Sequence, residues 1–258
     1  MNPSSFFESN KANSLTQESG WHAQNTVDRE LIEARMASTE ALFAVDSVGA
    51  FEFTDAVRPG KHSTIPLQQG YRRELFRSRS RNMELPMILA AATKEVLFDL
   101  FLDLMNPLGK LVDCVLETSH SHGDGSHEDL YREKIDLPVL MSTLCDYESL
   151  LLNDGCTGVA VVNPAKQLEV QLDEHKMLMI YAEDLKPFER ILFEYDVWPM
   201  ENMRFITEED HVHSSRPVYQ KQFDQLSFRL GMDIFCFEVR PRTCSCFSRF
   251  DWGRVFCS

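Results

Sequence analysis

The stretch TGVAVVNPAKQLEVQLDEHKMLMIYA, residues 157–182, indicates two neighbouring β-strands. Both of its halves are rich in valine, isoleucine and other apolar residues, which favour strands. The sequence NPAKQ, residues 163–167, joins the halves and has the composition of a turn. We therefore expect a β-hairpin, and this hairpin decides how the elements on either side of it can be arranged.

Helices are expected on both sides of this hairpin. DLPVLMSTLCDYESLLLNDG, residues 136–155, begins with Asp136 as a capping residue, has Pro138 in its first turn and repeats leucine at the helical spacing. DLKPFERILFEY, residues 184–195, follows the same rules after the hairpin. RPVYQKQFDQLSFRLG, residues 216–231, is expected to be the last long helix.

The order of these elements predicts the fold class. From Lys110 the expected order is strand (110–117), helix, strand, strand, helix and strand (203–207), and a further helix is expected before it at about 84–105. This order is typical of an α+β, ferredoxin-like (split βαβ) fold, in which an antiparallel sheet carries its helices on one face. We expect this fold, with extra N- and C-terminal helices.

Composition divides the chain into four segments. Residues 1–25 are rich in serine, asparagine and glutamine and are expected to be disordered. We expect a helical and loop extension at 26–82 with an arginine-rich segment at 72–81, and a single α+β domain at 83–239. A tail rich in cysteine and arginine follows at 240–258.

Charge restricts the partners. The net charge is -14, and acidic residues concentrate between residues 124 and 210, where they repel phosphate backbones. Residues 71–82 contain five arginines and one glutamate, which we interpret as an exposed basic segment facing the acidic domain. The alternative is a nucleic-acid or membrane patch. We expect an unknown protein partner or a small ligand, with no nucleic acid and no membrane.

Location follows from the apolar segments. The N-terminus has no basic start followed by an apolar run, so we expect that it is not a secretory signal. The most apolar segment, residues 85–105, is interrupted by four charged residues, which indicates a core helix rather than a membrane span. We expect a cytoplasmic protein in which Cys114, Cys145 and Cys156 are reduced core thiols.

A histidine-rich stretch, TSHSHGDGSHED at residues 118–129, follows a predicted strand. Its residues His120, His122 and Asp124 form the pattern H-x-H-x-D, and imidazole and carboxylate groups are suitable zinc ligands. The pattern resembles the metallo-β-lactamase motif H-x-H-x-D-H and departs from it at Gly125, where that family has histidine. The alternative is a polar, solvated loop.

A second group of candidate ligands comes from FITEEDHVHSS, residues 205–215. We expect His211 and His213 to meet His175 if this turn is irregular, and the alternative is a capped surface turn. We expect no cofactor, with zinc as the alternative. The candidate metal ligands are His120, His122, Asp124, His175, His211 and His213.

Cys156 is the candidate nucleophilic thiol, because glycines lie on both sides of it in NDGCTG. Catalysis by this thiol requires His175 or His127 beside it. The alternative is a small buried residue at the start of a strand.

The runs at residues 136–164, 169–182 and 205–215 resemble an uncharacterised family of bacterial proteins of the kind found in planctomycetes. The resemblance covers roughly residues 111–231. It implies a recurring bacterial domain and brings no known activity, cofactor or catalytic residue.

The function expected first is a non-catalytic binding or protein-interaction module. The sequence contains no complete catalytic motif, no glycine-rich phosphate loop and no dinucleotide fingerprint. The alternative is a metal-dependent hydrolase that uses the His/Asp cluster. The sequence leaves open whether the chain is an enzyme.

Overall fold

The computed structural model describes residues 38–78, 83–120 and 128–234. The expected disordered N-terminus and the cysteine-rich tail lie outside these residues. The chain divides into two compact units, residues 1–45 and 46–258. In the first unit residues 38–43 are helical. The second unit holds the sheet, the helices that cover it and the candidate site.

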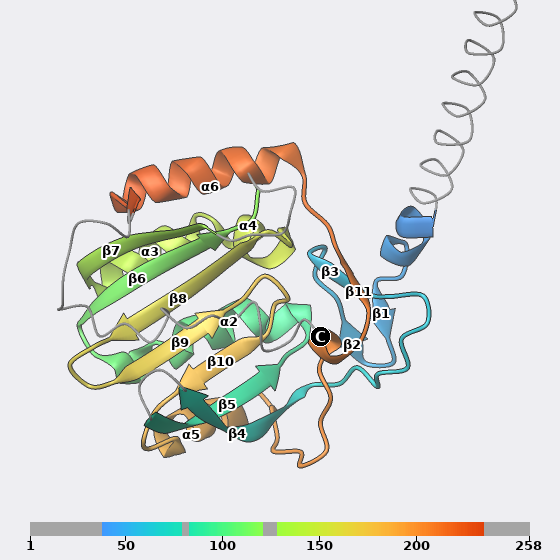
Figure 1. Ribbon diagram of the computed structural model, residues 1–258, viewed down its shortest axis with the longest axis horizontal. Helices are drawn as coiled ribbons and strands as arrows, with labels where there is room; N and C mark the ends of the chain where they lie inside the picture. The colour runs from blue at the N-terminus through green and yellow to red at the C-terminus, as the bar shows by residue number, and fades with distance from the viewer. Residues whose placement is uncertain (1–37, 79–82, 121–127, 235–258) are drawn as a thin grey trace, which may run out of the picture. The chain divides into compact units, whose positions relative to one another are not determined.

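One antiparallel sheet makes up most of the second unit (Figure 1). Its strands are β4 (Gly70–Ser78), β5 (Met83–Ala91), β6 (Leu111–Thr118), β7 (Glu128–Asp136), β8 (Thr157–Asn163), β9 (Leu168–Leu172), β10 (Leu178–Tyr181) and β12 (Asp233–Ile234). Their order across the sheet is β12-β7-β6-β8-β9-β10-β5-β4, and neighbouring strands are antiparallel throughout. The expected α+β class with an antiparallel sheet is confirmed.

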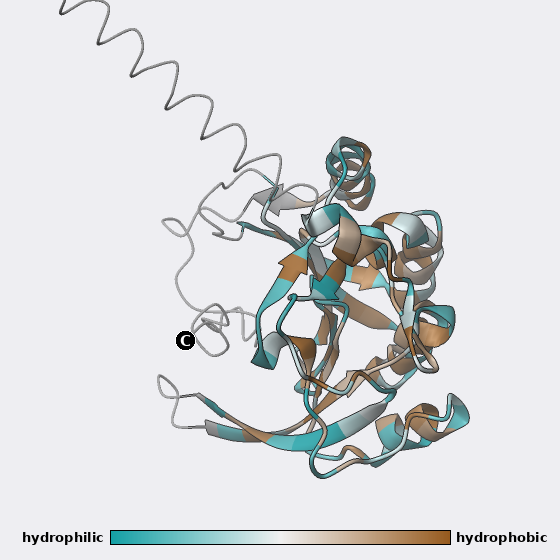
Figure 2. Cartoon of the chain, turned by 90° about the vertical axis from the view of Figure 1, so that its right-hand side faces the viewer, coloured by the Kyte–Doolittle hydropathy of each residue, from teal (hydrophilic) through white to brown (hydrophobic). Residues whose placement is uncertain are grey.

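Helices cover one face of this sheet (Figure 2). They are α2 (Lys94–Leu104), α3 (Leu137–Cys145), α4 (Glu148–Asn153), α5 (Lys186–Glu194) and α6 (Pro217–Leu230). Apolar side chains from all five helices join one buried cluster with strand residues such as Ile88, Cys114 and Leu172. Burial of this apolar surface is the main source of folding free energy. Among the described helices, none has the length and apolar composition needed to cross a membrane.

The hairpin expected at residues 157–182 is confirmed, and the stretch adds a third strand. β8 pairs with β9, and Val161 lies opposite Val170. The chain then turns at residues 173–177, where Lys176 has a positive φ of 64° and the Asp173 N–H donates to the Met177 carbonyl (3.1 Å). This turn returns the chain as β10 and carries His175.

The ferredoxin-like order is not formed. β6 and β8 are direct antiparallel neighbours, whereas a split βαβ unit has another strand between the two that flank its helix. β7, which the sequence pattern does not predict, pairs with the other edge of β6. Most of its side chains are half-buried or exposed, so it lacks a clear apolar pattern. Residues 203–207, expected to be a strand, instead lead into the 3-10 turn η2 (Ile206–Glu208).

The prediction of a helix at about residues 84–105 is wrong for the first half of this range, which forms β5. The second half forms α2. Ile88 joins the main core and Leu89 joins a second apolar cluster on the opposite face of the sheet. A strand that is apolar on both faces lacks the period-two alternation and resembles a buried helix in sequence. The described part of the arginine-rich segment forms β4 and pairs with β5. Cys145, expected in the core, is exposed.

Two small sheets complete the described part of this unit. β1 (Ser47–Val48) pairs with β2 (Phe51–Glu52), and β3 (Val57–Pro59) pairs with β11 (His211–His213). β3 lies in a stretch that the sequence predicts to be loop. Its pairing with β11 joins segments about 150 residues apart and fixes the backbone of two histidines.

Glu169 is a buried carboxyl group on the sheet face opposite the helices. It is fully buried on β9, where Gln171 donates a hydrogen bond to its Oε1 and Tyr181 lies opposite it on β10. Burial raises the pKa of Glu169 to about 7, although the Gln171 hydrogen bond opposes the shift. Burial, together with the nearby Glu169 and Glu117, also raises the pKa of Tyr181.

The wild type should lose unfolding free energy as the pH rises, and the substitution Glu169→Gln should remove this loss. The unfolded chain releases the Glu169 proton near pH 4.5 and the folded protein near pH 7. The stabilising contribution of this group is therefore complete below pH 4.5 and is lost as the pH rises through 7. The wild type should lose on the order of 3 kcal/mol of unfolding free energy relative to E169Q across this range.

Urea unfolding of both proteins from pH 4.5 to 8 measures this difference. Glu201→Gln, at an exposed position, is the matched control and should follow the wild type. Parallel stability curves for E169Q and the wild type would contradict the argument.

Candidate metal centre

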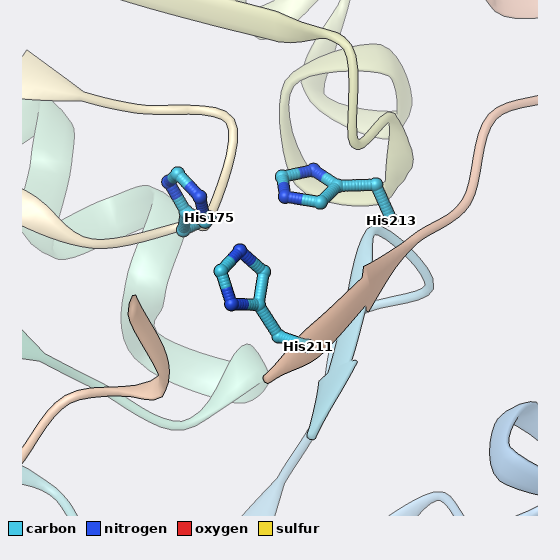
Figure 3. Close-up of side chains that lie close together, drawn as sticks. All are labelled: His175, His211 and His213. Atoms are coloured by element: carbon cyan, nitrogen blue, oxygen red, sulfur yellow. The ribbon is translucent and has the colours of Figure 1, made fainter. Parts of the chain in front are cut away.

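The structure brings together three of the histidines singled out in the sequence. His175 lies in the turn between β9 and β10, and His211 and His213 are the two ends of β11. The rings of all three point into one shared space (Figure 3). His122 and Asp124 lie outside the described residues. His120 belongs to a different cluster, described below.

The β11 strand explains why two of these histidines act together. Successive side chains of a strand alternate between its faces, so His211 and His213 share one face. The backbone of β11 is held beyond both ends: Gly60 N–H donates to the Asp210 carbonyl (2.7 Å), and Ser214 N–H donates to the Ala56 carbonyl (2.8 Å). The pair is therefore presented on a fixed backbone.

The turn at residues 173–177 places the third histidine. The Asp173 carboxylate accepts a hydrogen bond from Met177 N–H (2.8 Å), and the Asp173 carbonyl accepts one from Lys176 N–H (3.1 Å). These two bonds close the turn around His175. Its ring centroid lies 4.9 Å from that of His211 and 4.7 Å from that of His213.

The three rings have a spacing that suits one shared ligand. The centroids of His211 and His213 are 5.1 Å apart, and one nitrogen from each of the three rings lies within 4.8 Å of the others. Two ligands of a tetrahedral zinc ion are roughly 3.4 Å apart, given zinc–nitrogen distances of about 2.0–2.1 Å. Small ring rotations would close the difference.

Each ring has its Nδ1 atom against an oxygen acceptor. The acceptors are the Asp173 carboxylate for His175 (3.0 Å), the Glu209 carbonyl for His211 (2.8 Å) and the Gly155 carbonyl for His213 (2.7 Å). None of these oxygens can donate a proton, so each Nδ1 carries the hydrogen. The lone pair of every neutral ring is therefore on Nε2.

This arrangement is the one found around metal-binding histidines. Such a histidine usually donates its second ring N–H to a carboxylate or backbone carbonyl, which fixes the tautomer and the ring orientation. All three rings here meet that condition, through three different chain segments. The histidine tautomers are thus set for an ion that binds Nε2.

The pKa values of the rings differ because their surroundings differ. Burial lowers the pKa of His213 to about 4, and the neighbouring His175 and His211 add to this shift. His213 is therefore neutral at pH 7. Burial also disfavours the charged form of His175, but the Asp173 carboxylate outweighs it and raises the pKa of His175. A positive charge is favoured at this end of the cluster.

A buried lysine lies next to the cluster. Lys176 Nζ donates to the Thr157 carbonyl (2.8 Å), and burial lowers the pKa of this lysine to about 8. The sequence gives no clue to its burial, because lysine is usually exposed. Asp173 was also not singled out there, although its spacing of two residues from His175 is what permits the Nδ1 contact.

A small cavity adjoins the cluster on the side of His175. Its volume is about 50 Å³, enough for roughly four water molecules. Its walls are mainly apolar, with Phe51, Phe53 and Phe205 among them, and Arg204 contributes a charged group. A small molecule with an apolar group would fit beside His175.

A second cluster contains His120, Asp154 and Cys156, which offer ligand atoms within 4.8 Å of one another. The sequence predicts His175 or His127 as the partner of Cys156, and His127 lies outside the described residues. Among the described residues it is His120 that lies beside Cys156, because the β6–β8 pairing brings the end of β6 to the start of β8.

The substitution Gly155→Ala should disturb the site through the backbone. A Cβ atom here would lie 2.4 Å from the Ala56 carbonyl oxygen and 2.9 Å from the Ser214 carbonyl oxygen. Neither backbone atom can turn aside, so the ends of β3 and β11 must shift. The free energy of unfolding should fall by about 1–3 kcal/mol, as overpacking usually costs.

Urea unfolding tests the stability, and the NMR signals of the histidine rings report the Nδ1 bond of His213. The control is Gly158→Ala, whose Cβ would lie 3.1 Å from the end of the Glu117 side chain (Oε2) and at an ordinary contact distance, 3.5 Å, from the Asp173 Cα, so no backbone atom has to shift. A G155A protein as stable as G158A, with unchanged histidine signals, would refute the backbone explanation.

No protein-family model, curated protein or solved structure matches the chain. The resemblance to a bacterial family therefore stays a prediction. Evidence on function comes from the geometry of the histidine cluster.

Proposed function

We propose that the chain is a metal-dependent hydrolase that binds one zinc ion through the Nε2 atoms of His175, His211 and His213. The observation that supports this most strongly is the hydrogen bond from each Nδ1 to an oxygen acceptor. Three histidines that only happened to be close would have no reason to share one tautomer. The binding or interaction module expected first from the sequence stays a prediction.

Three protein ligands favour a catalytic over a structural ion. Structural zinc sites usually have four protein ligands, whereas catalytic sites have three and keep a position open for water. Zinc lowers the pKa of a bound water to about 7, which supplies a nucleophile for hydrolysis. The adjoining cavity is lined by His175, and its apolar walls favour a substrate with a small apolar group beside the bond that is cleaved.

The other expectations from the sequence have no independent support. A bacterial source, a cytoplasmic location, and the lack of nucleic-acid and membrane partners remain predictions. An unknown protein partner also remains a prediction, and it is compatible with hydrolase activity.

Zinc content tests the proposal. Untagged protein, purified without chelators or a nickel column, should contain zinc, and His211→Ala and His213→Ala should each lower its content by about one ion per chain. His62→Ala, at an exposed position outside the cluster, is the matched control and should retain the wild-type content. Elemental analysis of the four proteins measures this.

Activity is the second measurement on the same proteins. Hydrolysis of small esters and amides with apolar acyl groups should be present in the wild type and H62A, and absent from H213A and from chelator-treated enzyme. Equal zinc content in the wild type and H213A, with no change in melting temperature when zinc is added, would overturn the proposal.

The substitution Asp173→Asn should weaken zinc binding without removing a ligand. Asparagine keeps an oxygen near His175 but loses the carboxylate charge that holds the Nδ1 hydrogen. Loss of such an outer contact usually costs 10–100-fold in metal affinity. Competition with a chromophoric chelator should show this loss for D173N and not for Asp224→Asn, an exposed control. Equal affinities would mean that the carboxylate does not orient His175.

A further inference from the structure

The second cluster lies where β6 ends and β8 begins. His120 follows β6 by two residues, and Asp154 and Cys156 stand on either side of Gly155, just before β8. Asp154 is fully buried, and the His120 side chain is 7% exposed. The potential ligand atoms of the three side chains lie within 4.8 Å of one another.

Two buried polar atoms in this cluster lack a hydrogen-bond partner. They are Nε2 of His120 and Oδ1 of Asp154. Nε2 lies 2.9 Å from the other carboxylate oxygen of Asp154. Burial disfavours the charged form of Asp154, but contacts with the His120, Ser215 and Thr157 side chains outweigh it and lower the pKa of this carboxyl group. Buried polar atoms without partners are rare in folded proteins, and they indicate a bound group or a water molecule.

The contacts of the His120 ring show why a cation would suit this place. Its Nδ1 lies 2.8 Å from the Thr118 hydroxyl oxygen, which also accepts the His120 backbone N–H (3.2 Å). The Thr118 hydroxyl can donate to Nδ1 or accept from it, so the Nδ1–H tautomer is available, and in it the Nε2 lone pair faces the carboxylate of Asp154. The 2.9 Å space between Nε2 and the carboxylate oxygen attracts a positive charge, which is either a proton on Nε2 or a metal ion that displaces it.

A nucleophilic role for Cys156 fits this geometry less well. A catalytic thiol needs a ring nitrogen free to take its proton. Both nitrogens of His120 already lie beside oxygens, those of Thr118 and Asp154. The ring is therefore arranged as a ligand of a shared ion rather than as a base for the thiol.

The nearby charges are compatible with a divalent ion. Asp154 and a Cys156 thiolate together would balance two positive charges. Lys176 interacts electrostatically with both groups, and Asp173 and Glu174 compensate its charge. Thr157 Oγ1 donates to Asp154 Oδ2 (2.5 Å) and so orients the carboxylate from outside.

We infer that His120, Asp154 and Cys156 form a second metal site, with one nitrogen, one oxygen and one sulfur ligand for zinc. These are the three ligand types that zinc accepts in proteins. The site would join the end of β6 to the start of β8 and leave a position for a further ligand. It does not depend on the proposed three-histidine site, whose ligands are all nitrogen.

Cobalt(II) titration separates the two sites, because only the second contains sulfur. The full chain carrying Cys→Ser at the four cysteines beyond Ile234 serves as the background, so that thiols of the tail do not contribute. These positions are Cys236, Cys244, Cys246 and Cys257. In this background a thiolate-to-cobalt charge-transfer band in the near ultraviolet should appear with about one equivalent of cobalt.

Cys156→Ser should abolish the band, and Asp154→Asn should weaken cobalt binding at this site at least about tenfold. Cys145→Ser, at an exposed cysteine, is the matched control and should keep the band. His213→Ala should also keep it, because His213 is not a ligand of this site and the Gly155 backbone is still held by its N–H bond to the Ser214 carbonyl. Thermal unfolding of each variant confirms that it is folded, and C156S is nearly isosteric with the wild type.

The outcomes distinguish the two proposals. A charge-transfer band that C156S removes and H213A retains supports the second site, whatever happens at the histidines. Cobalt binding that H213A removes, with no band in any protein, overturns the second site and leaves the proposed function standing. Absence of both signals overturns both.

Discussion

Three segments of the chain meet at Gly155, at a separation that only glycine permits. Its N–H donates to the Ser214 carbonyl (2.8 Å), its carbonyl accepts from His213 Nδ1 (2.7 Å), and its Cα faces the Ala56 carbonyl so closely that no Cβ fits. This contact holds β3 and β11 against the start of β8. Both candidate metal clusters depend on it, because one uses His213 and the other uses the residues on either side of Gly155.

The charged groups near this contact have a cost in stability. Asp154 and Asp173 are buried carboxylates and Lys176 is a buried ammonium, and desolvation disfavours each charge. The structure compensates with hydrogen bonds, from Thr157 to Asp154 and from the backbone of Met177 to Asp173. Buried charges of this kind are more frequent at functional sites than in structural cores. Their concentration at one end of the sheet agrees with the position of the histidines.

The sequence allows much of the fold to be predicted where one face of an element is apolar. The hairpin at 157–182 and the helices α5 and α6 form as expected, because their apolar residues follow a single period. β5 is apolar on both faces, so its pattern resembles a helix, and β7 lacks a clear apolar pattern. Together with β4 in the arginine-rich segment and the absence of a strand at residues 203–207, these two strands explain why the observed strand order differs from the predicted one.

The candidate site is predictable only in part, because its contacts depend on tertiary structure rather than on the apolar pattern of single elements. The sequence predicts that His175 meets His211 and His213 if an irregular turn brings them together. The three histidines are close, but the reason is strand β11, which places His211 and His213 on one face through its pairing with β3. The contact of His120 with Asp154 and Cys156 depends on the register of β6 against β8, which no local pattern reveals. The hydrogen bonds to Nδ1 likewise depend on backbone carbonyls, whose directions are set by tertiary structure.

The pairing of β3 with β11 also bears on the order of folding. It closes a loop of about 150 residues, whereas the turn that carries His175 is local. Closing so long a loop has an entropic cost that must be met before the pairing is formed, so we expect this pairing to form late in folding. The three histidines would then come together after most of the chain is folded. An ion bound there would slow the unfolding of the completed protein and leave the rate of folding nearly unchanged.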